Sequence, residues 1–454
     1  MQEKRLKKIT ALFIIGVMYF FLGMIAVRIV VQKVVVQRFH VENRVTDLLT
    51  GKKDSIVDDE IQLDWKKQYP FSAEALSMGA EKAEEEAQDV ATAETERQAT
   101  ILDKLKHKLN LYVSDDLFQY RRIVETAGRY DRLIGWNLHN YAEYNSVSKL
   151  DDGYLVVFEE EQDVTDQVES VSDFYQFCEG QGIKFLYVQA PGKVGKYVDP
   201  EISGKLDFSN QNMDALTDGL KDGDVPVLDI RELLKEEDQQ SYHARFYRTD
   251  HHWRTQTGLW AAKQILHELN QDGDLGADET LLNTDQFTFE NYENWFLGSQ
   301  GKKVTLAQTE PDDFCMIYPK YHTQLRCVIP SREIDETGDF SVTYNMQQMD
   351  KKDYYDRNPY GAYNHNGSTY TEYFNEEEGK QGKILFIGDS FEDCVVPFLA
   401  LIVKNINVLD LRTFDGSVRT YVEENRPDIV VVMYNPSSLN PIDWNTHTST
   451  YDFR

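Results

Sequence analysis

The spacing of apolar and polar residues divides the chain into three parts. Residues 9–27 form an apolar run without a charged side chain, and four basic residues precede it within the first eight positions. Residues 72–111 are rich in Ala, Glu and Lys and contain almost no Gly or Pro, which favours a solvated helical spacer. From about residue 117, short apolar segments alternate with amphipathic ones, which indicates a folded domain.

The pattern of this domain predicts an α/β fold. Apolar strands are expected at 153–158 and 183–188, with an amphipathic helix at 164–180 between them. Strand, helix and strand with glycine punctuation are typical of a parallel sheet. The C-terminal part repeats the pattern, with expected strands or helices at 383–387, 394–403, 406–411, 418–425 and 428–433. We therefore predict a mostly parallel sheet flanked by helices.

The stretch 270–379 is interpreted differently. It is irregular, rich in Asp, Tyr and Gly, and shows no clear helix period. We expect it to be an insertion or cap within a domain that covers residues 117–454.

The apolar run at 9–27 predicts a membrane anchor. About twenty apolar residues span a bilayer as a helix, and the basic flank favours a cytoplasmic N-terminus. A cleaved signal peptide is the alternative, but its apolar core is usually shorter and is followed by an A-x-A site. We predict a tail and single-pass transmembrane helix at 1–31 and a juxtamembrane and helical spacer at 32–116. The remainder is then extracytoplasmic, because no second apolar run of that length follows.

Charge and cysteine content narrow the function classes. A net charge of −29 speaks against nucleic acid as a partner, since binding phosphates requires a basic surface. The four cysteines contain no C-x-x-C pair, which makes a zinc site of cysteines unexpected. Cys315 and Cys327 are candidates for a disulfide outside the membrane, and buried free thiols are the alternative.

The first segment that could carry out chemistry is Phe-Ile-Gly-Asp-Ser-Phe at 386–391. An apolar strand runs into Gly-Asp-Ser and then into an expected helix, so Ser390 is placed at the carboxyl end of a strand, where α/β sheets carry function. Backbone N–H groups at the helix start can stabilise an oxyanion. The plainer alternative is that Ser390 only caps the helix.

The second feature is Asp250-His251-His252-Trp253. A serine hydroxyl needs a histidine to take its proton and a carboxylate to orient that histidine. If the segment is extended, Asp250 and His252 share one face and His251 points to the other. We therefore expect His252 to be the base, Asp250 its partner, and His251 a residue that either packs or supports the site from behind. A metal site is the alternative, but adjacent histidines on a strand diverge and no further ligand lies at helical spacing, so we expect no metal.

Together these motifs resemble a known family. Asp-His-His-Trp followed much later by Gly-Asp-Ser-Phe is similar to the SGNH-hydrolase-like acetyltransferase domains of the alginate O-acetyltransferase type, in their DHHW variant. Weaker matches to motifs of this family occur in the family's order at 152–155, 188–193, 298–302, 409–412 and 426–429. The resemblance covers about residue 117 to the C-terminus. The Asp and His precede the serine here, which reverses the order of ordinary SGNH hydrolases, so their oxyanion blocks cannot be located by position.

The resemblance implies a function and a site. It implies that Ser390 is the nucleophile that carries an acetyl group, with His252 as base and Asp250 as its partner. Family members acetylate extracytoplasmic polysaccharides, without a soluble cofactor, and often beside a multispanning membrane acyltransferase that supplies acetyl. We therefore expect an O-acetyltransferase at the cell membrane. The alternatives are a carbohydrate acetylesterase with the same triad and a non-catalytic glycan-binding or assembly protein.

Two further sets of residues are candidates on weaker signals. Tyr434 and Asn435 end the last apolar strand and are candidates for oxyanion donors, although an ordinary loop before Pro436 explains them equally well. Candidates for acceptor binding lie beside the histidines or in the Gly-Ser-Gln-Gly-Lys segment: Trp253, Ser299, Gln300 and Lys302. Segments of this composition are more often turns.

Overall fold

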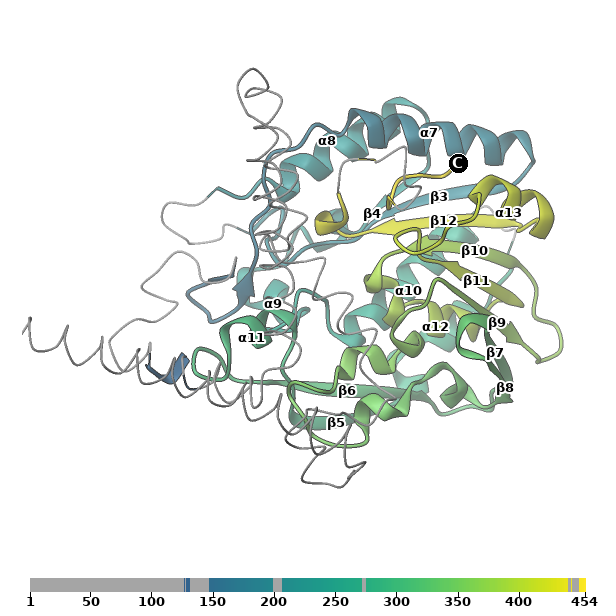
Figure 1. Ribbon diagram of the computed structural model, residues 1–454. Coiled ribbons are helices and arrows are strands. Elements are labelled where there is room, and N and C mark those ends of the chain that lie inside the picture. The colour runs from purple at the N-terminus through teal and green to yellow at the C-terminus, as the bar shows by residue number, and fades with distance from the viewer. Residues whose placement is uncertain are drawn as a thin grey trace, which may run out of the picture. The chain divides into compact units, whose positions relative to one another are not determined.

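The computed structural model describes residues 126, 128–130, 147–198, 206–271, 275–439, 442 and 449–454 (Figure 1). The expected membrane anchor at 9–27 and the helical spacer at 72–111 lie outside these residues. Among the helices that are described, none is long and apolar enough to cross a membrane.

A mixed sheet of eight strands forms the centre of the domain, in the order β4-β3-β12-β10-β11-β9-β7-β8 (Figure 1). The parallel half consists of β3 (Lys184–Gln189), β4 (Val227–Asp229), β10 (Lys383–Gly388), β11 (Asn405–Leu409) and β12 (Ile429–Tyr434). The remaining strands, β7 (Leu325–Ile329), β8 (Ile334–Gly338) and β9 (Tyr370–Asn375), are antiparallel. The prediction of a mostly parallel sheet therefore describes one half, and the sheet as a whole is mixed.

The parallel strands are buried on both faces, which explains their continuous apolar sequences. In β10, Leu385 and Ile387 face one core, and Ile384 and Phe386 face the other. The first core is covered by α7 (Thr165–Gly180), α8 (Ser209–Asp222) and α13 (Val418–Asn425). The second is covered by α10 (Thr255–Asn270) and α12 (Val396–Ala400). The short helix α9 (Gln239–His243) precedes the segment that carries His251 and His252.

The expected strand at 153–158 is not part of the central sheet. Only β2 (Leu155–Val156) forms there, and it pairs antiparallel with β1 (Ser148–Lys149) in a separate two-stranded sheet. Parallel crossovers run instead from β3 through α8 to β4 and from β10 through α12 to β11. The expected strand was wrong because its apolar residues pack onto local loops and α11 (Ser299–Val304), and have no parallel partner strand.

The stretch 270–379 contains regular structure. A long hairpin, β5 (Phe287–Phe296) with β6 (Asp312–Pro319), forms its own sheet, and β7, β8 and β9 extend the central one. In β7 and β9 buried and less buried residues alternate, which is the period of an antiparallel strand rather than of a helix. Short 3-10 helices connect these elements: η3 (Glu279–Leu282), η4 (Thr284–Gln286), η5 (Pro330–Arg332), η6 (Phe340–Thr343), η7 (Met346–Met349), η8 (Pro359–Ala362) and η9 (Asn364–Asn366).

All four cysteines are buried and free. Cys315 lies on β6 and Cys327 on β7, so the candidate disulfide between them does not form in this structure. Burial raises the pKa of the Cys327 thiol to about 12, which leaves it protonated and unreactive.

Candidate active site

Ser390 lies where β10 passes into the short helix η10 (Ser390–Cys394), at the carboxyl end of a parallel strand. Asp389 fixes this turn. Its Oδ1 accepts from the backbone N–H of Phe391 at 2.9 Å, and its Oδ2 accepts from the backbone N–H of Asn435 at 2.8 Å and from the Asn435 Nδ2 at 2.7 Å. Because Asn435 follows β12 directly, these bonds join the turn to the neighbouring strand.

The three residues expected to form the triad lie together. His252 Nε2 is 2.6 Å from Ser390 Oγ, and His252 Nδ1 is 2.5 Å from Asp250 Oδ1. Asp250 and His252 are buried, whereas Ser390 is partly exposed. This arrangement allows the imidazole to remove the hydroxyl proton while the carboxylate fixes its tautomer.

Asp250 remains ionised despite its burial. Burial would raise the pKa of this carboxyl, but the adjacent His251 and His252, with hydrogen bonds from the His252 ring and the Ser299 backbone N–H, hold the pKa well below its usual value. The Ser299 N–H donates to Asp250 Oδ2 at 2.6 Å. An ionised carboxylate can stabilise the imidazolium that forms when His252 takes a proton.

The segment that carries Asp250 is held by side chains distant in the sequence. The carboxylate of Asp312 accepts from the backbone N–H groups of Arg248 and Thr249 at 2.9 and 2.8 Å and from Thr249 Oγ1 at 2.6 Å. Lys193 is buried, and its Nζ donates to Gln300 Oε1 at 2.6 Å and to two backbone carbonyls of residues 247 and 248 at 3.3 Å. Burial lowers the pKa of Lys193 to about 7.

Gly298 permits the close approach of α11 to Asp250. A Cβ at this position would lie 2.2 Å from the Cβ and 2.6 Å from the Cα of Asp250. The Gly298 N–H donates to Thr249 Oγ1 at 2.9 Å. The Gly-Ser-Gln-Gly-Lys segment therefore supports the carboxylate of the triad from behind.

The backbone at 250–252 is a bend and not a strand. For this reason the expectation that His251 points away from Asp250 was wrong. Its ring lies 3.8 Å from the ring of His252, and its Nδ1 lies 3.5 Å from Asp250 Oδ1. The expected pairing of His252 with Asp250 and Ser390 arises from this bend and from the hydrogen bonds that hold it.

Two aromatic rings enclose the His252 imidazole. The Tyr360 ring is stacked on it, with centroids 4.0 Å apart and an interplanar angle of 14°, and the Phe391 ring lies at 5.2 Å. Sequence reasoning missed Tyr360 and Asp312 as parts of the site, because no local motif connects them to the histidines, and it gave no role to Lys193, although Lys193 ends the segment 188–193 noted for the resemblance. It overlooked the anchoring role of Asp389, although Asp389 stands within the Gly-Asp-Ser motif.

The two oxyanion candidates have their side chains engaged elsewhere. Tyr434 is fully buried, and its hydroxyl donates to the carbonyl of Thr450. The Asn435 Nδ2 donates to Asp389 Oδ2, and its Oδ1 accepts from Ser437. In this structure the Asn435 side chain supports the nucleophile turn, residues 388–391, and the Tyr434 side chain packs in the core. Neither side chain points a free donor at Ser390.

The acceptor-binding candidates divide into two pairs. Trp253 is buried and donates through Nε1 to the carbonyl of Phe391 at 3.2 Å, and Gln300 is buried against Lys193. Ser299 and Lys302 are partly exposed. The Ser299 Oγ lies 3.1 Å from His251 Nδ1, and Lys302 Nζ donates to the carbonyl of Arg357 at 3.1 Å. Only Ser299 is therefore placed in direct contact with the histidine pair among the described contacts.

The potential ligand atoms of Asp250, His251 and His252 all lie within 4.8 Å of one another. Two histidines and a carboxylate are a donor set that zinc accepts. However, Asp250 Oδ1 and His252 Nδ1 are hydrogen-bonded to each other. A cation bound to all three residues would have to replace that bond, so the arrangement fits a proton relay better than a metal centre.

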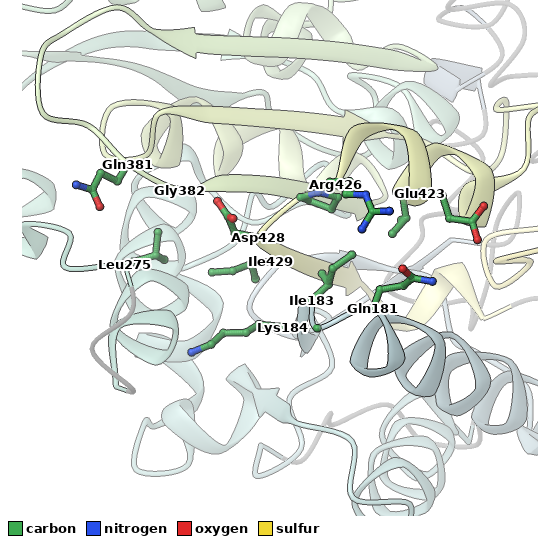
Figure 2. A pocket seen from close by; sticks show the side chains of 13 residues that line it. Gln181, Ile183, Lys184, Leu275, Gln381, Gly382, Glu423, Arg426, Asp428 and Ile429 are labelled. Atoms are coloured by element: carbon green, nitrogen blue, oxygen red, sulfur yellow. The ribbon is translucent and has the colours of Figure 1, made fainter.

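A cavity of about 490 Å³ lies at the opposite ends of the parallel strands from Ser390 (Figure 2). Its lining includes Lys184, Gly382 and Ile429, which stand at the amino ends of parallel strands, together with Arg426 and Asp428. Ligands of open α/β sheets bind outside the carboxyl ends of the strands. This cavity is therefore separate from the site around Ser390.

Comparison with known proteins shows what the domain is similar to. A family model described as the SGNH hydrolase-like domain of the acetyltransferase AlgX matches residues 150–309, a range that includes Asp250 and His252 and ends before Ser390. The resemblance to SGNH-hydrolase-like acetyltransferases of the alginate type is confirmed by this match. No curated protein matches the chain.

The solved structures of PatB1 share the fold. Two structures of Bacillus cereus PatB1, one of them with a sulfonyl adduct, are each 18% identical to the chain and cover 68% of it and 98–99% of PatB1, with TM-scores of 0.55 for the adduct and 0.56 without it. A DHHW family protein from Eubacterium siraeum is 16% identical, covers 64% of this chain and 90% of its own, and has a TM-score of 0.48.

Proposed function

We propose that the protein is an extracytoplasmic O-acetyltransferase that modifies a cell-surface or secreted polysaccharide through an acetyl-serine intermediate. The observation that carries the proposal is the continuous relay from Asp250 through His252 to Ser390, with contacts of 2.5 and 2.6 Å and a partly exposed serine. The match to the AlgX acetyltransferase domain supports acetyl transfer as the reaction.

In the first step Ser390 takes the acetyl group. Its Oγ attacks the carbonyl carbon of the donor while His252 Nε2 accepts the hydroxyl proton. The tetrahedral intermediate then collapses, the bond to the leaving group breaks, and the imidazolium returns the proton to that group. The backbone N–H of Ser390, at the start of η10, is a donor for the developing oxyanion.

In the second step the acceptor takes the acetyl group from Ser390. His252 removes the proton of a sugar hydroxyl, whose oxygen attacks the acetyl carbon. The bond between that carbon and Ser390 Oγ breaks, and the proton passes from His252 to Oγ. The resting enzyme is then restored, and no soluble cofactor takes part.

Acetyl donation and anchoring belong to the same proposal. A multispanning membrane acyltransferase would supply acetyl groups, and the apolar run at 9–27 would hold the domain beside it. A reporter fused after Arg454 tests the topology. Activity of the reporter only in an extracytoplasmic assay is the expected result, and activity in the cytoplasm would overturn both the location and the substrate class.

An esterase with the same triad is the main competitor, because it differs only in letting water reach the acetyl-serine. The test gives the full-length chain an activated acetyl ester with and without oligosaccharides, and measures free acetate and acetylated sugar. We expect oligosaccharides to divert acetate into acetylated sugar. Fast acetate release that no sugar diverts would identify an esterase, and a folded chain without any turnover would support a glycan-binding protein. Ser390→Ala is the control for background hydrolysis.

A further inference from the structure

The second histidine of the motif lies on the open side of the site. The rings of His251 and Tyr360 lie 3.8 and 4.0 Å from the His252 ring, and among the described residues they make no ring contact with each other. They therefore take opposite sides of the imidazole. Tyr360 is 2% exposed, whereas the His251 side chain is 28% exposed. His251 is therefore the partly exposed neighbour of the His252 ring, on the side away from Tyr360.

The two ring nitrogens of His251 have different surroundings. Nδ1 lies 3.1 Å from Ser299 Oγ and 3.5 Å from Asp250 Oδ1. The ionised carboxylate favours the tautomer with the proton on Nδ1, which then donates to Ser299 Oγ. Nε2 has no hydrogen-bond partner within the described part of the chain, and it is not among the enclosed atoms that lack one. It therefore presents a lone pair to the open site.

The electrostatics of the site keep this lone pair available. Burial lowers the pKa of His251 to about 3, and the neighbouring His252, Lys193 and Lys303 act in the same direction against the opposing charge of Asp250. His251 is thus neutral at neutral pH. A neutral imidazole can accept a hydrogen bond, and it does not repel the positive charge that His252 gains during the reaction.

We propose that His251 binds the acyl acceptor, with Nε2 accepting a hydrogen bond from a hydroxyl next to the one that His252 deprotonates. The ligand class is a carbohydrate with vicinal hydroxyl groups, since the two adjacent imidazoles, 3.8 Å apart and tilted by 38°, can each contact one of two neighbouring hydroxyls. The inference rests on the proposed function and adds a determinant of acceptor choice to it. His251 takes no proton, and the bonds made and broken remain those of the transfer to the sugar hydroxyl.

The test separates acylation from transfer. The full-length chain and its variants receive 4-nitrophenyl acetate, and the burst of nitrophenol reports acylation of Ser390. Transfer is then measured to a vicinal diol, such as a methyl glycoside, and to a simple alcohol. His251→Phe keeps a ring against His252 but removes both nitrogens. His251→Asn keeps a neutral acceptor atom.

In His251→Phe we expect the acylation burst to be retained, a loss of transfer to the diol of roughly 3- to 10-fold beyond any change in the burst rate, which is the effect of one hydrogen bond, and little such loss with the simple alcohol. His251→Asn should restore part of the loss. An unchanged ratio of diol to alcohol transfer, or a burst that is lost in a folded variant, would overturn the proposal. Loss of wild-type activity with a chelator and its return with zinc would also overturn it, in favour of a metal. A wild-type chain without any burst would instead refute the proposed function.

Discussion

The two halves of the active site are built in different ways. The nucleophile turn at 388–391 joins two adjacent elements, and one carboxylate, Asp389, ties it to the end of β12. The bend at 250–252 closes through two local hydrogen bonds, from the His252 N–H to Asp250 Oδ1 and from the Tyr247 N–H to the His252 carbonyl, both at 3.1 Å, but it also depends on distant residues. It is held by Asp312, Lys193 and the start of α11, which come from three other parts of the chain.

Their electrostatics differ as well. On the side of the bend, Asp250 stays ionised beside two histidines. On the side of the nucleophile, burial raises the pKa of Glu392 and of Asp393 well above the usual values, so both carboxyls stay protonated. Burial therefore favours neutral carboxyls at Glu392 and Asp393, whereas Asp250 is kept ionised next to the base, where its charge assists proton transfer.

The largest effect is expected from the base itself. His252→Ala should lower activity by a factor of at least about a thousand, as losses of a triad member do. His251→Ala should keep a measurable fraction, since it removes one contact and leaves the relay intact. Rates of both variants, with circular dichroism to confirm folding, provide the measurement. Equal losses in two folded variants would point to a joint role such as a metal pair.

A smaller effect is expected from the support of the bend. In Gly298→Ala the new Cβ meets Asp250, and overpacking of this kind costs about 1–3 kcal/mol of stability. Displacing the carboxylate should lower kcat by up to about a hundredfold. Gly180→Ala is the matched control, because nothing lies within 4 Å of the added atom. Thermal unfolding and kcat are compared for the two variants, and a Gly298→Ala enzyme with normal kcat would refute the role of α11.

The smallest effect on the reaction is expected from the protonated carboxyls behind the nucleophile. Because the folded pKa of Glu392 is raised, its contribution to stability is complete below pH of about 4.5 and is lost as the pH rises through the folded value. Glu392→Gln should flatten this fall, by at most roughly 1.4 kcal/mol per pH unit, and be the more stable protein at pH 8.

Denaturant unfolding at pH 5 and pH 8 measures this difference. Asp393 retains its own dependence on pH, so the slope is reduced and not abolished. The exposed Glu378→Gln is the control and should leave the slope unchanged. A Glu392→Gln protein with the wild-type slope would show that the carboxyl is ionised in the folded state.

The contrast between the locally built turn at Ser390 and the bend held by distant residues explains which parts of the structure could be predicted from the sequence. The apolar strands β10 and β12 and the Ser390 turn carry local signals, and their positions were predicted correctly. Asp250 and His252 were paired correctly, but by an alternation argument that fails because the segment is a bend. The contribution of Tyr360 depends on contacts between segments far apart in the sequence, which no local pattern encodes. The antiparallel strands β7 and β9 were missed because their alternation was obscured by polar residues and turns.

The measurement that tests the central claim most directly is mass spectrometry of the full-length chain after brief incubation with an acetyl ester. The account predicts an acetyl group on Ser390 that disappears when an acceptor sugar is added, and that does not form in Ser390→Ala. A folded wild-type chain that turns over the ester without acetyl on Ser390, or with a stable acetyl group on another residue, would contradict it.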